Sequence, residues 1–347
     1  MKTIRRLIIF LLMGALIMPA GVSAAYLFTN DAMEQQQGDA YAAQLEAETG
    51  TVTYRGETFT LQQLGNELLK SASNRRWNNY TFKILNQKEA NAYAVPGGHV
   101  YITSGLYEML GWHEKAFIIA HEIGHVEMAH WRETIEKQAQ TAFAAALLIR
   151  LITGSDEETK EIFEWVGPII AIAVSRGYGF DKEHEADRKA FDYAVKAGYS
   201  PGGGAVTFQL MSDKFGGDDP PSDLSSDIIN FINPHPKFST RISRQLQYLM
   251  EYSGGRVTVR DSAVYLDNRF VIDCKPFQHY TAKERAYYMA GELARLAHDG
   301  LLTIEQKFSA NDDGFYINDK LIFYMVKDEE SGRTIAQRIV NIVHGVQ

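Results

Sequence analysis

The sequence predicts an α+β fold that is mainly helical and is followed by a smaller module of strands and helices. Apolar residues recur at helical spacing in several segments, above all from Phe117 to His130. Two β-type runs, Thr81 to Leu85 and His99 to Thr103, interrupt this helical pattern. Beyond Ser253-Gly254-Gly255 the pattern changes to alternating strands, and 347 residues are enough for two domains.

Composition is that of a globular protein, with 45% hydrophobic and 22% charged residues. The net charge is −8, and no dense cluster of Lys and Arg follows the N-terminus, so a nucleic-acid partner has no electrostatic support. Cys274 is the only cysteine, which excludes an internal disulfide and a thiolate metal site.

Residues 1–24 have the pattern of a secretory signal peptide. A basic start precedes the apolar run Leu7 to Met18, Pro19 breaks it, and small residues place cleavage after Ala24. The alternative is an uncleaved membrane anchor, because the uncharged run continues to Thr29 and reaches spanning length. In both cases we expect an exported protein of the periplasm or cell envelope.

Residues 25–60 form a polar lead-in, as a mobile segment or a surface helix, before an amphipathic helix from Leu61 to Ser71. Asn91 to Gly98 lies between the two β-type runs, and its Pro-Gly-Gly excludes a central strand. Two alternatives are open for this segment. It is an ordinary hairpin turn, or it enters an edge strand on which an extended peptide can pair.

The segment Phe117 to His130 contains the motif His121-Glu122-Ile123-Gly124-His125. Residues four apart lie one helical turn above each other, so both histidines can face one ion. Two imidazoles favour zinc, and Glu122 is placed to take the proton of an activated water. The alternative is a buried helix whose histidines only pack, but three scarce residues in fixed register favour the metal.

A third ligand must come from elsewhere, since Met128 and Trp131 occupy the positions where a metzincin has glycine and histidine. His130 is one residue off that register and is interpreted as a residue that packs in the core or supports a ligand from behind. The segment Asp181 to Asp187 offers three candidates, namely Glu183, His184 and Glu185.

HEIGH, followed by E-x-x-A-D at residues 183–187 and by H-P-x-x-x-x-R at residues 235–241, resembles the HtpX/BepA-type zinc metalloendopeptidases, the family that includes the CAAX prenyl proteases. The resemblance covers about Leu61 to Met250. It implies a gluzincin-like catalytic domain with a small edge sheet. The four transmembrane helices of the HtpX branch and the tetratricopeptide pattern of BepA have no counterpart in the sequence.

The same resemblance implies roles for individual residues. Glu183 is the third zinc ligand, and Asp187, one turn later, orients a ligand histidine. Glu185 then points about 200° away and is interpreted as structural. Arg241 is a candidate for holding the substrate carbonyl or the oxyanion. His235 is a possible latch that approaches the metal, and the alternative for both is a charged loop at a helix start.

The catalytic domain is expected over residues 61–252, and residues 256–347 are expected to form a small α+β module of unknown function. A capping box at Thr281 to Glu284 predicts that its main helix begins there. Cys274 lies in this module, and no motif in it indicates an activity.

The sequence therefore predicts a zinc-dependent endopeptidase with one Zn²⁺ per chain and Glu122 as general base. The expected partners are polypeptides, unfolded or from the envelope, with possible peripheral membrane association and no nucleic acid. The oligomeric state is not specified by the sequence. The alternative is a gated protease that acts mainly as a holdase or assembly factor in the envelope.

Overall fold

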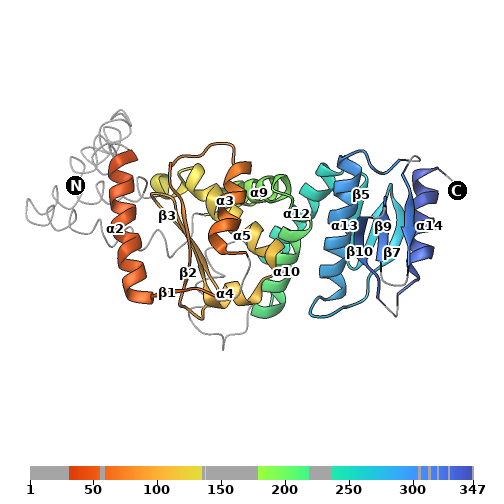
Figure 1. Cartoon of the computed structure of the whole chain (residues 1–347), viewed down its shortest axis with the longest axis horizontal. Helices are drawn as coiled ribbons and strands as arrows, with labels where there is room; N and C mark the ends of the chain where they lie inside the picture. The colour runs from red at the N-terminus through yellow and green to blue at the C-terminus, as the bar shows by residue number, and fades with distance from the viewer. Residues whose placement is uncertain are drawn as a thin grey trace, which may run out of the picture.

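The structure is a computed structural model that describes residues 31–54, 59–134, 137, 179–218, 236–303, 306–311, 314–318, 320–326 and 329–345. The predicted signal peptide and His235 lie outside the described residues. The elements follow one another in layers along the long axis of the molecule, from α2 at one end to α14 at the other (Figure 1).

The first layers are a helix and a four-stranded sheet. The helix is α2 (Asp31–Thr49), and the strands are β1 (Thr51–Val52), β2 (Thr81–Leu85), β3 (Ala92–Val95) and β4 (His99–Thr103). The strand order is β1-β2-β4-β3, with β2 and β4 parallel and the other pairs antiparallel. The two β-type runs are thus confirmed as strands, and the segment between them holds both an edge strand and a turn.

Both faces of this sheet are covered. Side chains alternate along a strand, so Leu85, Val95 and Tyr101 pack on α2. The opposite face joins the main core and packs on α3 (Leu61–Ser71) and α5 (Trp112–Glu127), with the short α4 (Ser104–Met109) following β4. The lead-in segment therefore contributes a helix and a strand to this part of the fold.

Three further helices complete the central layers: α9 (Phe180–Lys196), α10 (Gly203–Phe215) and α12 (Phe238–Tyr252). The helix α9 lies against α5, and α10 lies against both α5 and α12 (Figure 1). The approach of α9 to α5 is close at Gly124, where an added Cβ would lie 3.2 Å from Cβ of Lys189. The small residue inside the HEIGH motif thus lets the two helices come together.

The C-terminal part places two three-stranded antiparallel sheets between α13 (Ala282–His298) and α14 (Gly332–Val343) (Figure 1). The strands are β5 (Val257–Arg260), β6 (Ala263–Leu266), β7 (Arg269–Asp273), β8 (Phe308–Ala310), β9 (Gly314–Ile317) and β10 (Lys320–Tyr324). The predicted capping box is present: the side chain of Thr281 accepts a hydrogen bond from the main-chain N–H of Glu284, and the side chain of Glu284 accepts one from the main-chain N–H of Thr281. Asp267 and Asn268 have φ of 51° and 61°. They form a two-residue turn that divides a continuous run of strand-forming residues into β6 and β7.

The prediction of a mixed α+β fold with small sheets is confirmed. Within the described residues, no helix is long and apolar enough to cross a membrane.

Candidate metal centre

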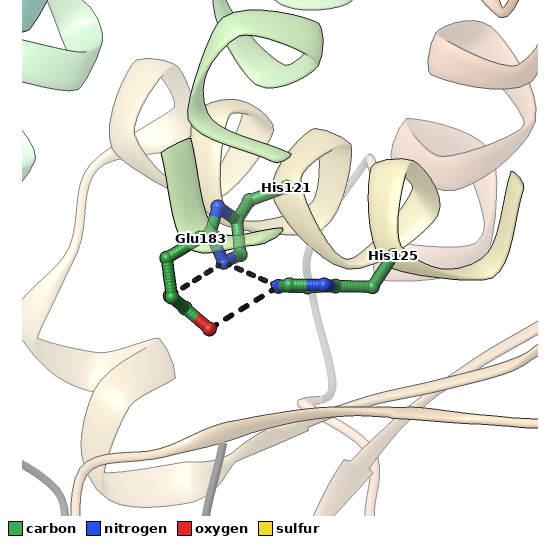
Figure 2. A group of neighbouring side chains, drawn as sticks. All are labelled: His121, His125 and Glu183. Atoms are coloured by element: carbon green, nitrogen blue, oxygen red, sulfur yellow. Dashed lines mark hydrogen bonds and ion pairs between the residues drawn. The ribbon is translucent and has the colours of Figure 1, made fainter. Parts of the chain in front are cut away.

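The helices α5 and α9 bring three side chains together in the interior. His121 and His125 lie one turn apart on α5, and Glu183 comes from the first turn of α9 (Figure 2). Their nitrogen and carboxylate oxygen atoms all lie within 4.8 Å of one another, and Glu183 is fully buried. Among the described residues these are the ones that form such a group.

The spacing of these atoms fits a tetrahedral ion. Ligand atoms about 2 Å from zinc at tetrahedral angles are about 3.3 Å apart. The Nε2 atoms of His121 and His125 are 2.9 Å apart. Glu183 Oε2 lies 3.5 Å from Nε2 of His121, and Glu183 Oε1 lies 3.6 Å from Nε2 of His125. These three distances, which involve a different oxygen of Glu183 for each histidine, lie on either side of the expected value. The donor set is the two imidazoles and one carboxylate that zinc accepts.

Asp187 lies behind His121. Its Oδ1 is 3.0 Å from Nδ1 of His121, so this outer nitrogen donates a proton to Asp187, and when the ring is neutral Nε2 presents its lone pair to the centre. Burial lowers the pKa of His121, but Asp187 and Glu183 outweigh it and raise this pKa to about 9. The pocket therefore favours positive charge.

Arg241, from α12, is paired with Asp187. Its Nε and Nη2 atoms donate to the two carboxylate oxygens at 2.9 and 2.5 Å, and both side chains are buried. Burial raises the pKa of Asp187, yet Arg241 and His121 together hold it below the ordinary value. The guanidinium lies 3.5 Å from Nδ1 of His121, on the side of the ring away from His125. Its Nη2 also lies 3.7 Å from Oε2 of Glu183, so Arg241 holds Asp187 and contacts a candidate ligand.

Glu122 faces the sheet. It is 7% exposed, and it accepts a hydrogen bond from the main-chain N–H of Ala94 in β3. Desolvation raises its pKa to about 7. A carboxyl group whose pKa lies near neutral pH can both take and return a proton.

His125 has a different neighbour behind it. Its Nδ1 lies 2.8 Å from Nδ1 of His130, and Nε2 of His130 lies 3.2 Å from Oε2 of Glu185. Burial lowers the pKa of His130, against the opposing effect of Glu185. Sequence reasoning interpreted Glu185 as structural and left open whether His130 packs or supports a ligand, because neither contact follows from helical spacing.

The structure thus brings together His121, Glu122, His125, Glu183, Asp187 and Arg241. His235 lies outside the described residues, so its role as a latch stays a prediction.

Known proteins share the region that builds this centre. Residues 56–249 match peptidase family M48. Two relatives from Escherichia coli K12 are named Metalloprotease YcaL and Metalloprotease LoiP. YcaL is 31% identical over 137 residues, which cover 39% of this chain and 52% of the relative. LoiP is 28% identical over 133 residues, covering 38% and 51%.

A third relative is the putative β-barrel assembly-enhancing protease of Vibrio cholerae, 28% identical over 185 residues, or 51% of this chain and 37% of that protein. The chain spans about half or less of the length of these relatives. The expectation of a metallopeptidase is confirmed by the family match. Because that match covers more than half of the chain, the protein belongs to peptidase family M48.

Proposed function

We propose that the protein is a zinc-dependent endopeptidase that hydrolyses peptide bonds of polypeptides in the cell envelope. The observation that carries the proposal is the convergence of His121, His125 and Glu183 next to a buried Glu122. The gluzincin-like arrangement and the division into a catalytic domain over 61–252 and a module over 256–347 belong to the same proposal.

When bound at this centre, zinc would polarise the substrate carbonyl and acidify a water molecule. Glu122 takes the proton of that water and returns it to the leaving amine. Burial supports this role because it brings the pKa of Glu122 to about 7, near the pH at which a base and an acid are both effective.

The strand β3 offers a place for the substrate main chain. Among the described residues it is the last strand of its sheet. All four residues of β3 pair with β4, and the main-chain N–H of Thr103 donates to the carbonyl of Asn91. Because main-chain groups alternate along an antiparallel ladder, those of Ala92 and Ala94 then point away from β4, where the N–H of Ala94 donates to Glu122. An extended peptide can pair along this edge with its scissile bond beside Glu122.

Arg241 and Asp187 act in this proposal as a pair. Asp187 fixes the ring of His121, and Arg241 fixes Asp187. A direct action of Arg241 on the oxyanion, as the resemblance implies, stays a second candidate role, since Nη2 of Arg241 lies 3.7 Å from Oε2 of Glu183.

The relatives support protein substrates and an envelope location for this chain. Two are named as metalloproteases, and others as β-barrel assembly-enhancing proteases. A secretory signal in residues 1–24 is consistent with this location.

The test is Glu122→Gln in the full chain, compared with Glu133→Gln as an exposed surface control. Gln cannot act as a base but leaves the three ligands in place, so we expect zinc content to be kept. Hydrolysis of an unfolded protein should fall by at least about 100-fold. Wild-type activity in Glu122→Gln would contradict the mechanism. A wild type that binds unfolded protein but does not cleave it would favour the holdase alternative.

A further inference from the structure

The outer nitrogen of each candidate ligand histidine meets a different kind of partner. For His121 the partner is the carboxylate of Asp187, at 3.0 Å. For His125 it is another imidazole, that of His130, and Glu185 lies behind that ring. We propose that His130 and Glu185 form a relay that orients His125 as a metal ligand and fixes its protonated nitrogen. This inference rests on the proposed function, because it needs a metal at the centre.

The order of the protons follows from the last member of the relay. A carboxylate oxygen accepts hydrogen bonds, so Nε2 of His130 carries the proton in its contact with Oε2 of Glu185. In a neutral ring Nδ1 of His130 is then an acceptor, and Nδ1 of His125 donates to it. Nε2 of His125 is left with its lone pair directed at the centre. The opposite order would set a lone pair against the carboxylate and a proton on the ligand nitrogen.

A break in the helix makes the contact possible. On a continuous helix, residues five apart point about 140° away from each other, so His130 would not meet His125. The helix α5 ends at Glu127, and Ala129 has a φ of 55°, in the left-handed region. The chain turns there before helical structure resumes at His130. A left-handed alanine costs about 1 kcal/mol, and it places a buried imidazole behind the second ligand.

Two residues of α9, Lys182 and Glu185, contact the segment that follows the break in the helix. Lys182 Nζ donates to the main-chain carbonyl of His130 at 3.1 Å and to Oγ1 of Thr134 at 3.2 Å. These bonds hold the segment after the break in position, next to Glu185. His130 itself is 1% exposed, whereas Glu185 is 56% exposed.

The N-terminal part of α9 thus supplies one candidate ligand and contributes to the support of both histidines. Glu183 contacts both histidines directly, Asp187 supports His121, and Glu185 supports His125 through His130. Supporting groups of this kind hold the ring orientation and raise the basicity of the ligand. His130 and Glu185 are therefore positioning residues, and their effect should be measured on metal affinity.

The experiment measures the Zn²⁺ affinity of the full chain by competition with a chromophoric chelator. We expect His130→Ala to weaken affinity about 10- to 100-fold, the range of such supporting contacts. Glu185→Gln should weaken it less, since its amide oxygen still accepts the bond without the charge. Adding Glu185→Gln to His130→Ala should cause no further loss, because Glu185 acts only through His130. His130→Gln, whose amide oxygen can accept from His125, should restore part of the affinity.

The matched control is Glu133→Gln, which removes a carboxylate that pairs with Lys182 at 3.0 Å in the same interface but does not touch His130 Nε2. It should bind zinc as the wild type does. The absorption spectrum of the Co²⁺-loaded protein should change in His130→Ala and not in this control. Should His130→Ala not fold, Glu185→Gln and His130→Gln give the same comparison.

The outcomes separate the two proposals. A wild type that binds no Zn²⁺ would overturn the proposed function. A wild type that binds, with folded His130→Ala and Glu185→Gln variants that bind equally well, would overturn only the relay. Losses that add up in the double variant would also overturn it, because they would show that Glu185 acts independently of His130.

Discussion

Glu183 and Glu185 lie two residues apart on α9 and differ in what they contact. Glu183 is fully buried against both histidines, whereas the side chain of Glu185 is more than half exposed and contacts His130. At saturating zinc, Glu183→Gln should therefore lose most of its bound metal, whereas Glu185→Gln should retain it. Elemental analysis after removal of free zinc measures the difference. Equal retention in the two variants would show that the wrong glutamate is assigned as ligand.

A second prediction at the residue scale concerns the ion pair of Asp187 and Arg241. Asp187→Asn removes the hydrogen-bonded carboxylate of the buried guanidinium and leaves only the more distant Glu183 at 3.7 Å, which should cost about 3–5 kcal/mol of unfolding free energy. Chemical denaturation measures this loss. The control is Asp192→Asn on the same helix, where an exposed pair with Arg188 contributes at most about 1 kcal/mol. Similar losses in the two variants would contradict a buried charge pair at the centre.

At the scale of elements, α13 meets the loop before α10 backbone to backbone. A Cβ on Gly291 would lie 2.4 Å from the main-chain nitrogen of Gly202, and one on Gly202 would lie 2.1 Å from the carbonyl oxygen of Tyr287. Glu114 at the start of α5 also accepts hydrogen bonds from Tyr280 and Tyr288. The C-terminal module is thus attached to the helix that carries the two histidines.

We expect Gly291→Ala to force α13 away from this loop. Overpacking of this kind costs about 1–3 kcal/mol, which offsets the roughly 1 kcal/mol that alanine gains over glycine in a helix. Unfolding free energy should therefore fall or stay level, where helix propensity alone would raise it. Lys283→Ala, on the exposed side of α13, should change stability by no more than about 0.5 kcal/mol. A clear stabilisation by Gly291→Ala would contradict the close approach.

The residues that the structure describes form two main hydrophobic cores, and these cores share helices. Phe191 and Val195 of α9 and Leu249 of α12 belong to the same core as the strands of the C-terminal module. The other face of α9, with Ala190 and Tyr193, belongs to the core around α5. Because one set of helices closes both cores, we expect the two parts to unfold together.

The positions of the tryptophans and of Cys274 provide a test of this expectation. All four tryptophans lie between residues 77 and 165, and Cys274 is buried in the module. Desolvation raises the pKa of the Cys274 thiol to about 12, so it should not react with a thiol reagent at pH 8 while folded. In the unfolded chain the pKa returns to about 8.5 and the thiol reacts. Tryptophan fluorescence and Cys274 labelling should give the same urea midpoint, and two separate midpoints would show independent domains.

Local sequence patterns predicted the elements that depend on short-range physics. The helix of the HEIGH motif, the strands at Thr81 and His99 and the capping box at Thr281 follow from periodicity and end signals within a few residues. The turn at Asp267 and Asn268 carries a weak local signal because neither residue is glycine, although both adopt a positive φ.

The sequence by itself determined that two histidines four apart, with a glutamate beside the first, would share one face of a helix, because helical geometry fixes that spacing. It also supplied the distant E-x-x-A-D motif, whose meaning rested on a resemblance. The resemblance implied that Asp187 orients a ligand histidine, but only the tertiary structure decided which histidine it supports and which residue lies behind the other. Asp187 reaches His121 because α9 packs on α5, and His130 reaches His125 because the chain turns at Ala129. Contacts of this kind depend on how helices pack and where they break, and no local pattern encodes either.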